Sequence, residues 1–311
     1  MRPYFRLPAV VMVLLVAFGG QLGAESRGVD WTLRPTQQEG LVRLSVFSTT
    51  DGGSWRSGFD LPASELDGLD FSRQGRREVS FALHRDAGRL DFEGYLKDGS
   101  GAGSFRFSPD PSYGQRMGSL DFTVDEDKQF AMALHDVSLQ FARQMREARL
   151  TGLSADKLIA FRVHGVSLGF IDALRAAGQA IESSDMLVAF RVHGVSPEMV
   201  TDLRRAGYSP SDDKLVALRV HGATPEWMSE LARHGYQGVS LERLIAFRVH
   251  GVSPEFIEGL QELGYPRADP EQLIAMRVHG VSPEMIADLK SRGLQNLSID
   301  KLIEMRVHGL Y

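Results

Sequence analysis

Arginine and histidine recur at a fixed spacing through the C-terminal part of this chain, and they are its most regular candidates for chemistry. The string Arg-Val-His-Gly occurs six times, with gaps of 29, 28, 29, 29 and 29 residues between successive histidines. Imidazole and guanidinium groups can bind metals, transfer protons or hold anions. The candidates are Arg162, Arg191, Arg219, Arg248, Arg277 and Arg306, with His164, His193, His221, His250, His279 and His308.

Distance excludes a metal site made from successive histidines. Packed helices lie about 8–10 Å apart, whereas each zinc ligand lies about 2 Å from the metal. The sequence shows no nucleophile, base and orienting group at recognisable spacing, and His84 is interpreted as a histidine at a strand end. We therefore expect no catalytic residues, no metal and no cofactor, and a protein that is not an enzyme. A hydrolase sited in residues 25–124 remains a minor alternative.

The fixed period predicts stacked repeats of two short helices each. In one copy, Ser240 is placed to cap the first helix, Gly251 to end it, and Ser253 with Pro254 to begin the second. A degenerate copy around His135 extends the array upstream, which predicts an α-solenoid of seven two-helix repeats over residues 125–311. One position of the second helix is predicted to pack in the core; it holds Phe170, Met199, Trp227, Phe256 and Met285.

Helical periodicity places Arg248 in the middle of an apolar arc that includes Leu244, Phe247 and Val249, with His250 on the opposite side. The arginines are therefore expected to tie adjacent repeats, and the histidines to cap helix ends. The alternative is that these residues form a cationic edge that grips an extended anionic ligand. A buried guanidinium needs partners, and the candidates are carbonyl groups of neighbouring helix ends or Asp156, Asp185, Asp213, Glu242, Glu271 and Asp300.

Residues 28–122 show a different period. Val79, Phe81 and Leu83 alternate with small or polar residues, and Asp-Gly-rich turns separate such segments. The pattern predicts an antiparallel β meander or sandwich. The glycine-rich run over residues 99–103 lacks the lysine of a phosphate-binding loop, so it is interpreted as a turn or bulge. The whole chain is therefore predicted to be α+β with two domains.

The N-terminus is typical of an export signal. Arg2 and Arg6 precede an apolar run, and small residues follow it up to Ala24. Residues 1–24 are expected to be a cleaved signal peptide, with no membrane-spanning segment after cleavage and a periplasmic or secreted mature protein. The chain has no cysteine and a formal net charge of −5. That charge disfavours nucleic acid as a partner.

Two stretches of the repeat region resemble a tandem helical-hairpin repeat of bacterial cell-envelope proteins: RVHGVSPEFIEGLQELGY, from Arg248 to Tyr265, and LSIDKLIEMRVHG, from Leu297 to Gly309. Residues 77–111 resemble the β segment that precedes such repeats. In some relatives the repeats follow an antirepressor-type membrane metallopeptidase sensor. The chain has no HExxH motif, so peptidase activity is not part of what the resemblance implies.

Two hypotheses of function follow. The first is a non-enzymatic interaction module in the periplasm or outside the cell, which binds a protein or peptide partner through the surface of the solenoid. The second is an envelope sensor that grips an anionic glycan or lipid headgroup through the repeated arginines and histidines. Dependence on salt distinguishes them, because binding to a polyanion weakens steeply as ionic strength rises.

Overall fold

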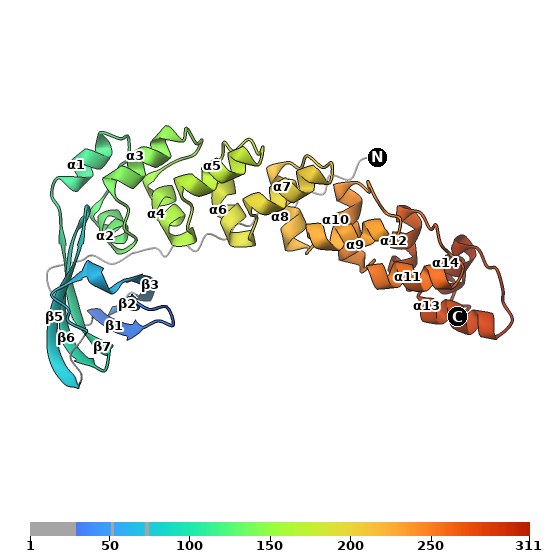
Figure 1. Cartoon of the computed structure of the whole chain (residues 1–311), viewed down its shortest axis with the longest axis horizontal. Helices are drawn as coiled ribbons and strands as arrows, with labels where there is room; N and C mark the ends of the chain where they lie inside the picture. The colour runs from blue at the N-terminus through green and yellow to red at the C-terminus, as the bar shows by residue number, and fades with distance from the viewer. Residues whose placement is uncertain (1–28, 51–52, 72–74) are drawn as a thin grey trace. The chain divides into compact units, whose positions relative to one another are not determined.

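The computed structural model describes residues 29–50, 53–71 and 75–311. The predicted signal peptide, residues 1–24, lies outside these residues. Strands fill the N-terminal part of the described chain and helices the rest (Figure 1), which confirms the α+β class. The described residues divide into two compact units: the first comprises those up to Leu168 together with Glu182–Val188, and the second comprises Gly169–Ile181 together with Ala189–Tyr311. In the described ranges, no helix has the length and apolar character that crossing a membrane requires.

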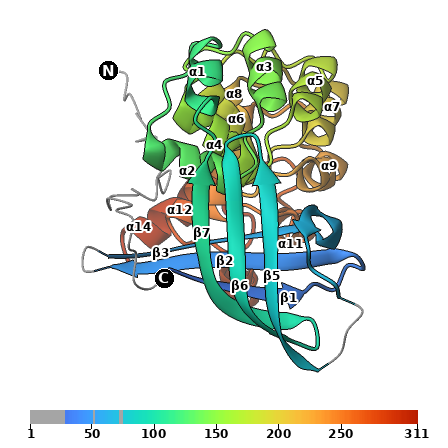
Figure 2. The same ribbon diagram turned by 90° about the vertical axis from the view of Figure 1, so that its left-hand side faces the viewer.

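The N-terminal strands form one antiparallel sheet in the order β3-β2-β1-β7-β6-β5-β4. Consecutive strands pair within β1–β3 and within β4–β7, while β3 and β4 lie at opposite edges; β1 also pairs with β7, so these two strands join the two halves of the sheet. In Figure 2, β5–β7 stand upright while β1–β3 cross them, as in part of a barrel. The described strands thus belong to a single sheet. They are β1 (Val29–Pro35), β2 (Leu41–Thr50), β3 (Gly53–Pro62), β4 (Leu66–Asp67), β5 (Arg76–Arg85), β6 (Gly88–Lys97) and β7 (Ser100–Pro109).

An indole ring lies at the centre of the sheet. Trp31 is fully buried, and its ring packs edge-on against Phe81 and Phe92 at centroid distances of 5.1 and 6.1 Å. Its Nε1–H donates to the carbonyl oxygens of Glu93 and Ser104, at 3.1 and 3.0 Å. The aromatic cluster therefore combines apolar burial with a satisfied polar group.

The glycine-rich run is part of a strand, which corrects the prediction of a turn or bulge over residues 99–103. The turn is confined to Asp98 and Gly99, and β7 begins at Ser100. A Cβ atom at Gly103 would collide with the carbonyl of Glu93 on β6. Glycine within a strand permits such close approach of two backbones. This strand was missed in the sequence because glycine has no side chain, so the run shows no alternation of apolar and polar residues.

The first helix of the array is joined to the sheet within the first unit. The array begins where the sequence predicted: Asp125 caps α2 (Glu126–Leu134), accepting from the Lys128 amide. Further along α2, Gln129 donates to the carbonyls of Ala87 and Asp110, both at 2.7 Å. The ring of Phe130 stacks on Phe105 of β7 at 6.0 Å. Alternating strand residues and the apolar face of α2 therefore share one core.

Six helix pairs follow the sheet in chain order, and α14 is the first helix of a seventh copy that has no second helix among the described residues. An additional short helix, α1 (Tyr113–Gly118), precedes the first pair. The pairs are α2 with α3 (Leu139–Glu147), α4 (Ala155–His164) with α5 (Leu168–Ala176), α6 (Ser184–His193) with α7 (Pro197–Arg205), α8 (Asp212–Val220) with α9 (Pro225–Arg233), α10 (Leu241–His250) with α11 (Pro254–Glu262), and α12 (Pro270–Val278) with α13 (Pro283–Ser291), before α14 (Ile299–Val307).

The predicted helix boundaries in the copy at residues 240–264 are confirmed. Ser240 accepts a hydrogen bond from the Arg243 amide at the start of α10, and Ser253 caps α11 in the same way. At the end of α10, Gly251 is left-handed, with φ of 74°. The amide of Val252 bonds to the Phe247 carbonyl at 2.8 Å, the main bond of a Schellman motif. Local cap chemistry therefore determines where both helices begin and end.

Candidate functional site

The repeated arginines tie neighbouring repeats through backbone carbonyl groups. In five of the six copies, the Nε–H donates to the carbonyl oxygen of the repeat histidine one copy earlier in the chain. These oxygens end their helices without a partner inside the helix, so a side chain from the next repeat satisfies them. The bonds are Arg162 to His135 (3.0 Å) in the first unit, and Arg219 to His193 (3.3 Å), Arg248 to His221 (3.2 Å), Arg277 to His250 (3.4 Å) and Arg306 to His279 (3.4 Å) in the second.

Four of the six acidic residues predicted as an alternative set of partners form a separate series of ion pairs. Each of these four pairs with a basic residue of the first helix in the preceding repeat. Carbonyls are therefore the observed partners of the arginine Nε atoms, and the acids strengthen the seam elsewhere. The pairs are Lys128–Asp156 (3.9 Å), Lys157–Asp185, Lys214–Glu242 (2.9 Å) and Arg243–Glu271.

An aromatic ring lies beneath most of these guanidinium groups, at the position predicted to pack in the core. Trp227 and Phe256 are buried there. A guanidinium over a ring face gains a cation–π interaction. In the two copies with Met199 and Met285, methionine occupies the position of the ring. The stacked pairs are Arg162–Phe141 (5.3 Å), Arg191–Phe170 (4.9 Å), Arg248–Trp227 (5.0 Å) and Arg277–Phe256 (5.0 Å).

The arginines are exposed, so the prediction that they run through the middle of an apolar arc is wrong. In α10 only Leu244 and Phe247 are buried. With Leu244 set at 0° and about 100° of rotation per residue, Phe247 falls near 300°, so the centre of the buried arc lies near 330°. On that wheel Arg248 falls at the margin of the arc. Val249 falls on the opposite side. The error came from counting Val249 as a core residue because it is apolar.

The repeated valine is therefore a surface residue in every complete copy of the motif. Its side chain is 51–57% exposed at all six positions, and these account for six of the ten exposed large hydrophobic residues in the described chain. Scattered exposed apolar residues are ordinary, but a regular set is not. The positions are Val163, Val192, Val220, Val249, Val278 and Val307.

The histidine rings do not cap helix ends in the second unit, contrary to the prediction. Within the described chain, five of them make no side-chain hydrogen bond or ion pair: His193, His221, His250, His279 and His308. It is the backbone carbonyl of the first four of these residues that holds the next arginine. The degenerate copy differs, because burial and, to a smaller extent, the charge of Arg162 lower the pKa of His135 to about 4. Its ring is neutral at pH 7.

We name the repeated Arg-Val-His set of the second unit the RVH edge; its arginines and valines are exposed, and its histidines are exposed or half-buried. It comprises residues 191–193, 219–221, 248–250, 277–279 and 306–308, and each copy contributes one arginine, one valine and one histidine. The arginine-to-carbonyl bonds link consecutive copies of the set. The edge is therefore a continuous row that repeats the same side chains.

Carboxylates accompany the guanidinium groups of this edge. A hydrogen bond from its own backbone amide lowers the pKa of Glu226, Thr224 adds a second, and the charge of Arg219 lowers it further. In another copy, a side-chain hydrogen bond from Ser282 is the main cause of the lowered pKa of Glu284, and Arg277 contributes. Both glutamates are ionised at neutral pH. The edge thus carries mixed charge.

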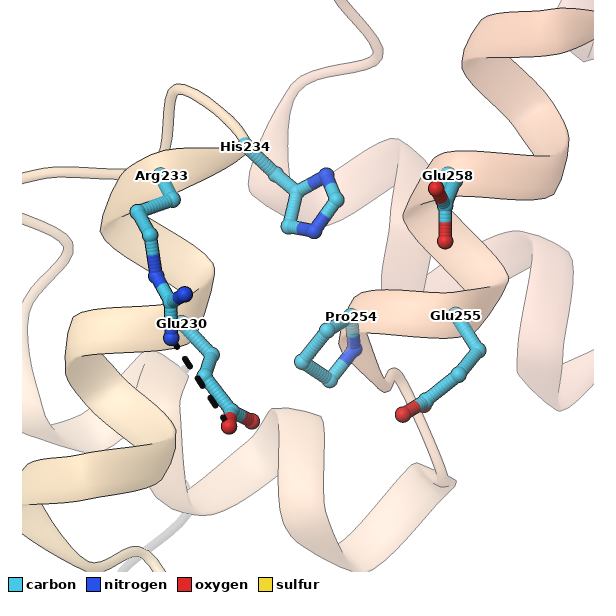
Figure 3. Close-up of a pocket in the computed structure, with 6 residues that line it drawn as sticks. All are labelled: Glu230, Arg233, His234, Pro254, Glu255 and Glu258. Atoms are coloured by element: carbon cyan, nitrogen blue, oxygen red, sulfur yellow. Dashed lines mark ion pairs between the residues drawn. The ribbon is translucent and has the colours of Figure 1, made fainter.

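A polar groove lies elsewhere in the second unit, between α9 and α11. Figure 3 shows His234 pointing from the end of α9 into this space, opposite Glu258 and Glu255 of α11. Arg233 lies near Glu230 on the same helix, at 3.8 Å. Nowhere in the described ranges do three histidine or acidic residues form a group suited to a metal ion. The groove is open and is lined by surface positions of the two helices.

His84 lies near the end of β5 and is exposed, which confirms its interpretation as a histidine at a strand end. Its Nε2 is 3.5 Å from a carboxylate oxygen of Asp67, and both side chains are exposed. The nearby Arg85 is largely buried and pairs with Glu65 at 2.7 Å and with Asp136 at 3.4 Å. The arginine thereby connects β5 to the degenerate repeat. This cluster has a structural role in the first unit.

We expect Arg248→Ala to lower the free energy of unfolding by about 1–3 kcal/mol. The substitution removes a charged hydrogen bond to the His221 carbonyl and the stacking on Trp227. Urea unfolding followed by circular dichroism measures the change. Arg205→Ala is the matched control, because Arg205 is exposed and pairs only within its own helix, which contributes about 0–1 kcal/mol. Equal effects of the two substitutions would contradict a seam role for Arg248.

The sequence interpretation found the arginine and histidine positions but missed the valine between them. A signal was present, because valine is identical in all six complete copies while outward positions of the second helix vary. No family model matches the chain, and no match is found among curated proteins. The geometry of the RVH edge is therefore the main guide to function.

Proposed function

We propose that this protein is a non-enzymatic interaction module whose helical repeats stack as an α-solenoid and bind a protein or peptide partner through the RVH edge. The observation that carries the proposal is the exposed valine in every complete copy. A valine on the outside of a helix adds no core packing, and β-branching lowers helix propensity. Contact with a partner is a reason to keep it.

Stacking is supported by polar contacts that connect repeats near to one another in sequence. In the second unit, Gln261 donates to the His234 carbonyl at 2.9 Å, and Lys290 donates to the Leu263 carbonyl at 2.6 Å. A tyrosine after the second helix also reaches a carbonyl 31 or 32 residues later. Such nearest-neighbour contacts are typical of solenoids. These tyrosine bonds are Tyr208 to Val239 (2.9 Å), Tyr236 to Ala268 (2.6 Å) and Tyr265 to Leu297 (2.7 Å).

The charge of the edge favours a polypeptide partner over a polyanion. In four of the five copies of the edge the arginine Nε is already engaged by a carbonyl, and carboxylates such as Glu226 and Glu284 lie near the guanidinium groups. A polyanion would meet repulsion from these carboxylates. An exposed valine offers nothing to a phosphate or sulfate group, whereas a peptide side chain gains from contact with it. The anionic glycan or lipid headgroup is therefore the second candidate.

We place the partner in the periplasm or outside the cell. The support is the sequence alone: two early arginines, an apolar run and a small-residue exit at residues 1–24. The absence of cysteine is compatible with an exported protein held together by its apolar core. The partner is then another protein of the cell envelope or its surroundings.

Capture from a cell-envelope extract tests this function. The immobilised full chain is expected to retain a protein partner that Val249→Asp loses, because the charge replaces an apolar contact at the centre of the RVH edge. Leu294→Asp is the control, since Leu294 is also an exposed apolar residue of the second unit but lies outside the edge. Protease treatment of the extract must abolish capture. Equal capture by both variants, or a retained ligand that resists protease, would contradict the proposal.

A further inference from the structure

The valine of the RVH edge stays the same where neighbouring surface positions have diverged. The fifth residue of each second helix from α7 to α13 is Thr201, Ser229, Glu258 and Ala287 in successive copies. Copies of a duplicated unit drift at surface positions that nothing constrains. Neither packing nor helix propensity constrains the valine. An identical contact made once in every repeat accounts for its retention.

The spacing of the edge selects the conformation of an extended ligand. The bond from each arginine to the preceding histidine carbonyl places consecutive copies of the edge side by side. Packed helices lie about 8–10 Å apart. A polyproline II segment advances about 9 Å per turn of three residues, whereas a β-strand returns a side chain to the same face after about 6.6–6.8 Å. Of these two periods, only that of polyproline II falls within the spacing of packed helices, so only this conformation presents one equivalent side chain to each repeat.

The side chains of the edge can bind the backbone carbonyl groups and apolar side chains that a polyproline II segment exposes. A polyproline II backbone has no internal hydrogen bonds, so its carbonyl groups accept from outside. One histidine ring per repeat is without a hydrogen bond or ion pair in the described chain and can donate, as in His221 and His250. The valine offers an apolar contact to a proline ring or an aliphatic side chain. The mixed charge of the edge suits a ligand without net charge.

Building on the function proposed above, we propose that the RVH edge of the second unit binds an uncharged, proline-rich segment of its partner in the polyproline II conformation, one turn per repeat. One apolar side chain of each turn contacts a valine, and one backbone carbonyl of each turn accepts from a histidine ring. Five copies of the edge, from Val192 to Val307, give a footprint of about fifteen residues at three residues per turn.

Labelled peptides of two to five Pro-Pro-Leu triplets test this proposal on the full chain by fluorescence anisotropy. Affinity is expected to rise with every added triplet up to five. A control peptide has the composition of the five-triplet peptide, with leucines at alternating intervals of two and four residues. It is expected to bind about tenfold more weakly, because losing one or two valine contacts corresponds to about one decade in Kd. Equal binding by the two peptides, or affinity independent of length, would overturn the proposal.

Two variants localise the binding. Val249→Asp is expected to weaken binding of the five-triplet peptide by about tenfold, and Leu294→Asp to leave it unchanged. If Val249→Asp abolishes capture of the protein partner but triplet peptides do not bind, the proposed function stands and the polyproline II ligand is wrong. If poly-glutamate binds instead, with affinity that falls steeply with salt, the edge is an anion site and both proposals fail.

Discussion

The substitution Phe247→Ala is expected to lower the free energy of unfolding by about 3–5 kcal/mol, the range for truncating a buried phenylalanine. Phe247 is fully buried in α10, and its ring meets Tyr236 edge-on at 6.3 Å. In a linear array each layer is stabilised only by its neighbours. A cavity in one central layer should therefore also separate the unfolding of the repeats on its two sides. Thermal and urea unfolding followed by circular dichroism would show a lower midpoint and a broader transition.

The control for this prediction lies two residues further along the same helix. Val249 is apolar like Phe247 but exposed, so Val249→Ala is expected to change stability by no more than about 0.5 kcal/mol. The difference in stability between the two variants distinguishes a residue that folding requires from one that only the surface uses. If Val249→Ala were as destabilising as Phe247→Ala, the valine would be a packing residue. The RVH edge would then lose the observation on which its proposed function rests.

The second large effect is expected in the sheet. Trp31→Ala should lower the free energy of unfolding by about 3–5 kcal/mol, because it removes the ring that packs edge-on against Phe81 and Phe92 and leaves two backbone carbonyls without the indole N–H. Trp31→Phe is expected to recover part of the loss by restoring apolar contact. Urea unfolding of both variants measures the two contributions. Full recovery by phenylalanine would mean that the hydrogen bonds of Trp31 contribute nothing.

The two predictions concern residues that fold the protein, whereas the proposed binding surface consists of residues that folding does not need. The arginines belong to both groups. Arg248 uses Nε to hold the His221 carbonyl and its planar face to cover Trp227, yet the group remains exposed. Arginine variants are therefore poor probes of binding, because they also loosen the seam. Valine and histidine variants are the cleaner probes.

Periodicity and cap residues were enough to predict the helices of the repeat region. Serine or threonine before each second helix, proline at the first position of α7, α9, α11 and α13, and glycine after first helices such as α10 act on backbone groups a few residues away. Such signals are local and need no knowledge of neighbours. The same locality explains why alternation revealed β5 and why the glycines of β7 concealed a strand.

The amino-acid sequence alone established the α+β class, the repeat period and the boundaries of helices such as α10 and α11, because these depend on contacts within a few residues. Tertiary structure alone decided which side of each helix is buried, since that depends on where the neighbouring repeat lies. It placed Val249 on the surface although its apolar character suggested a core position, and it gave Arg248 a carbonyl partner from another repeat. A side chain's surroundings come from segments distant in sequence, and no local pattern records them.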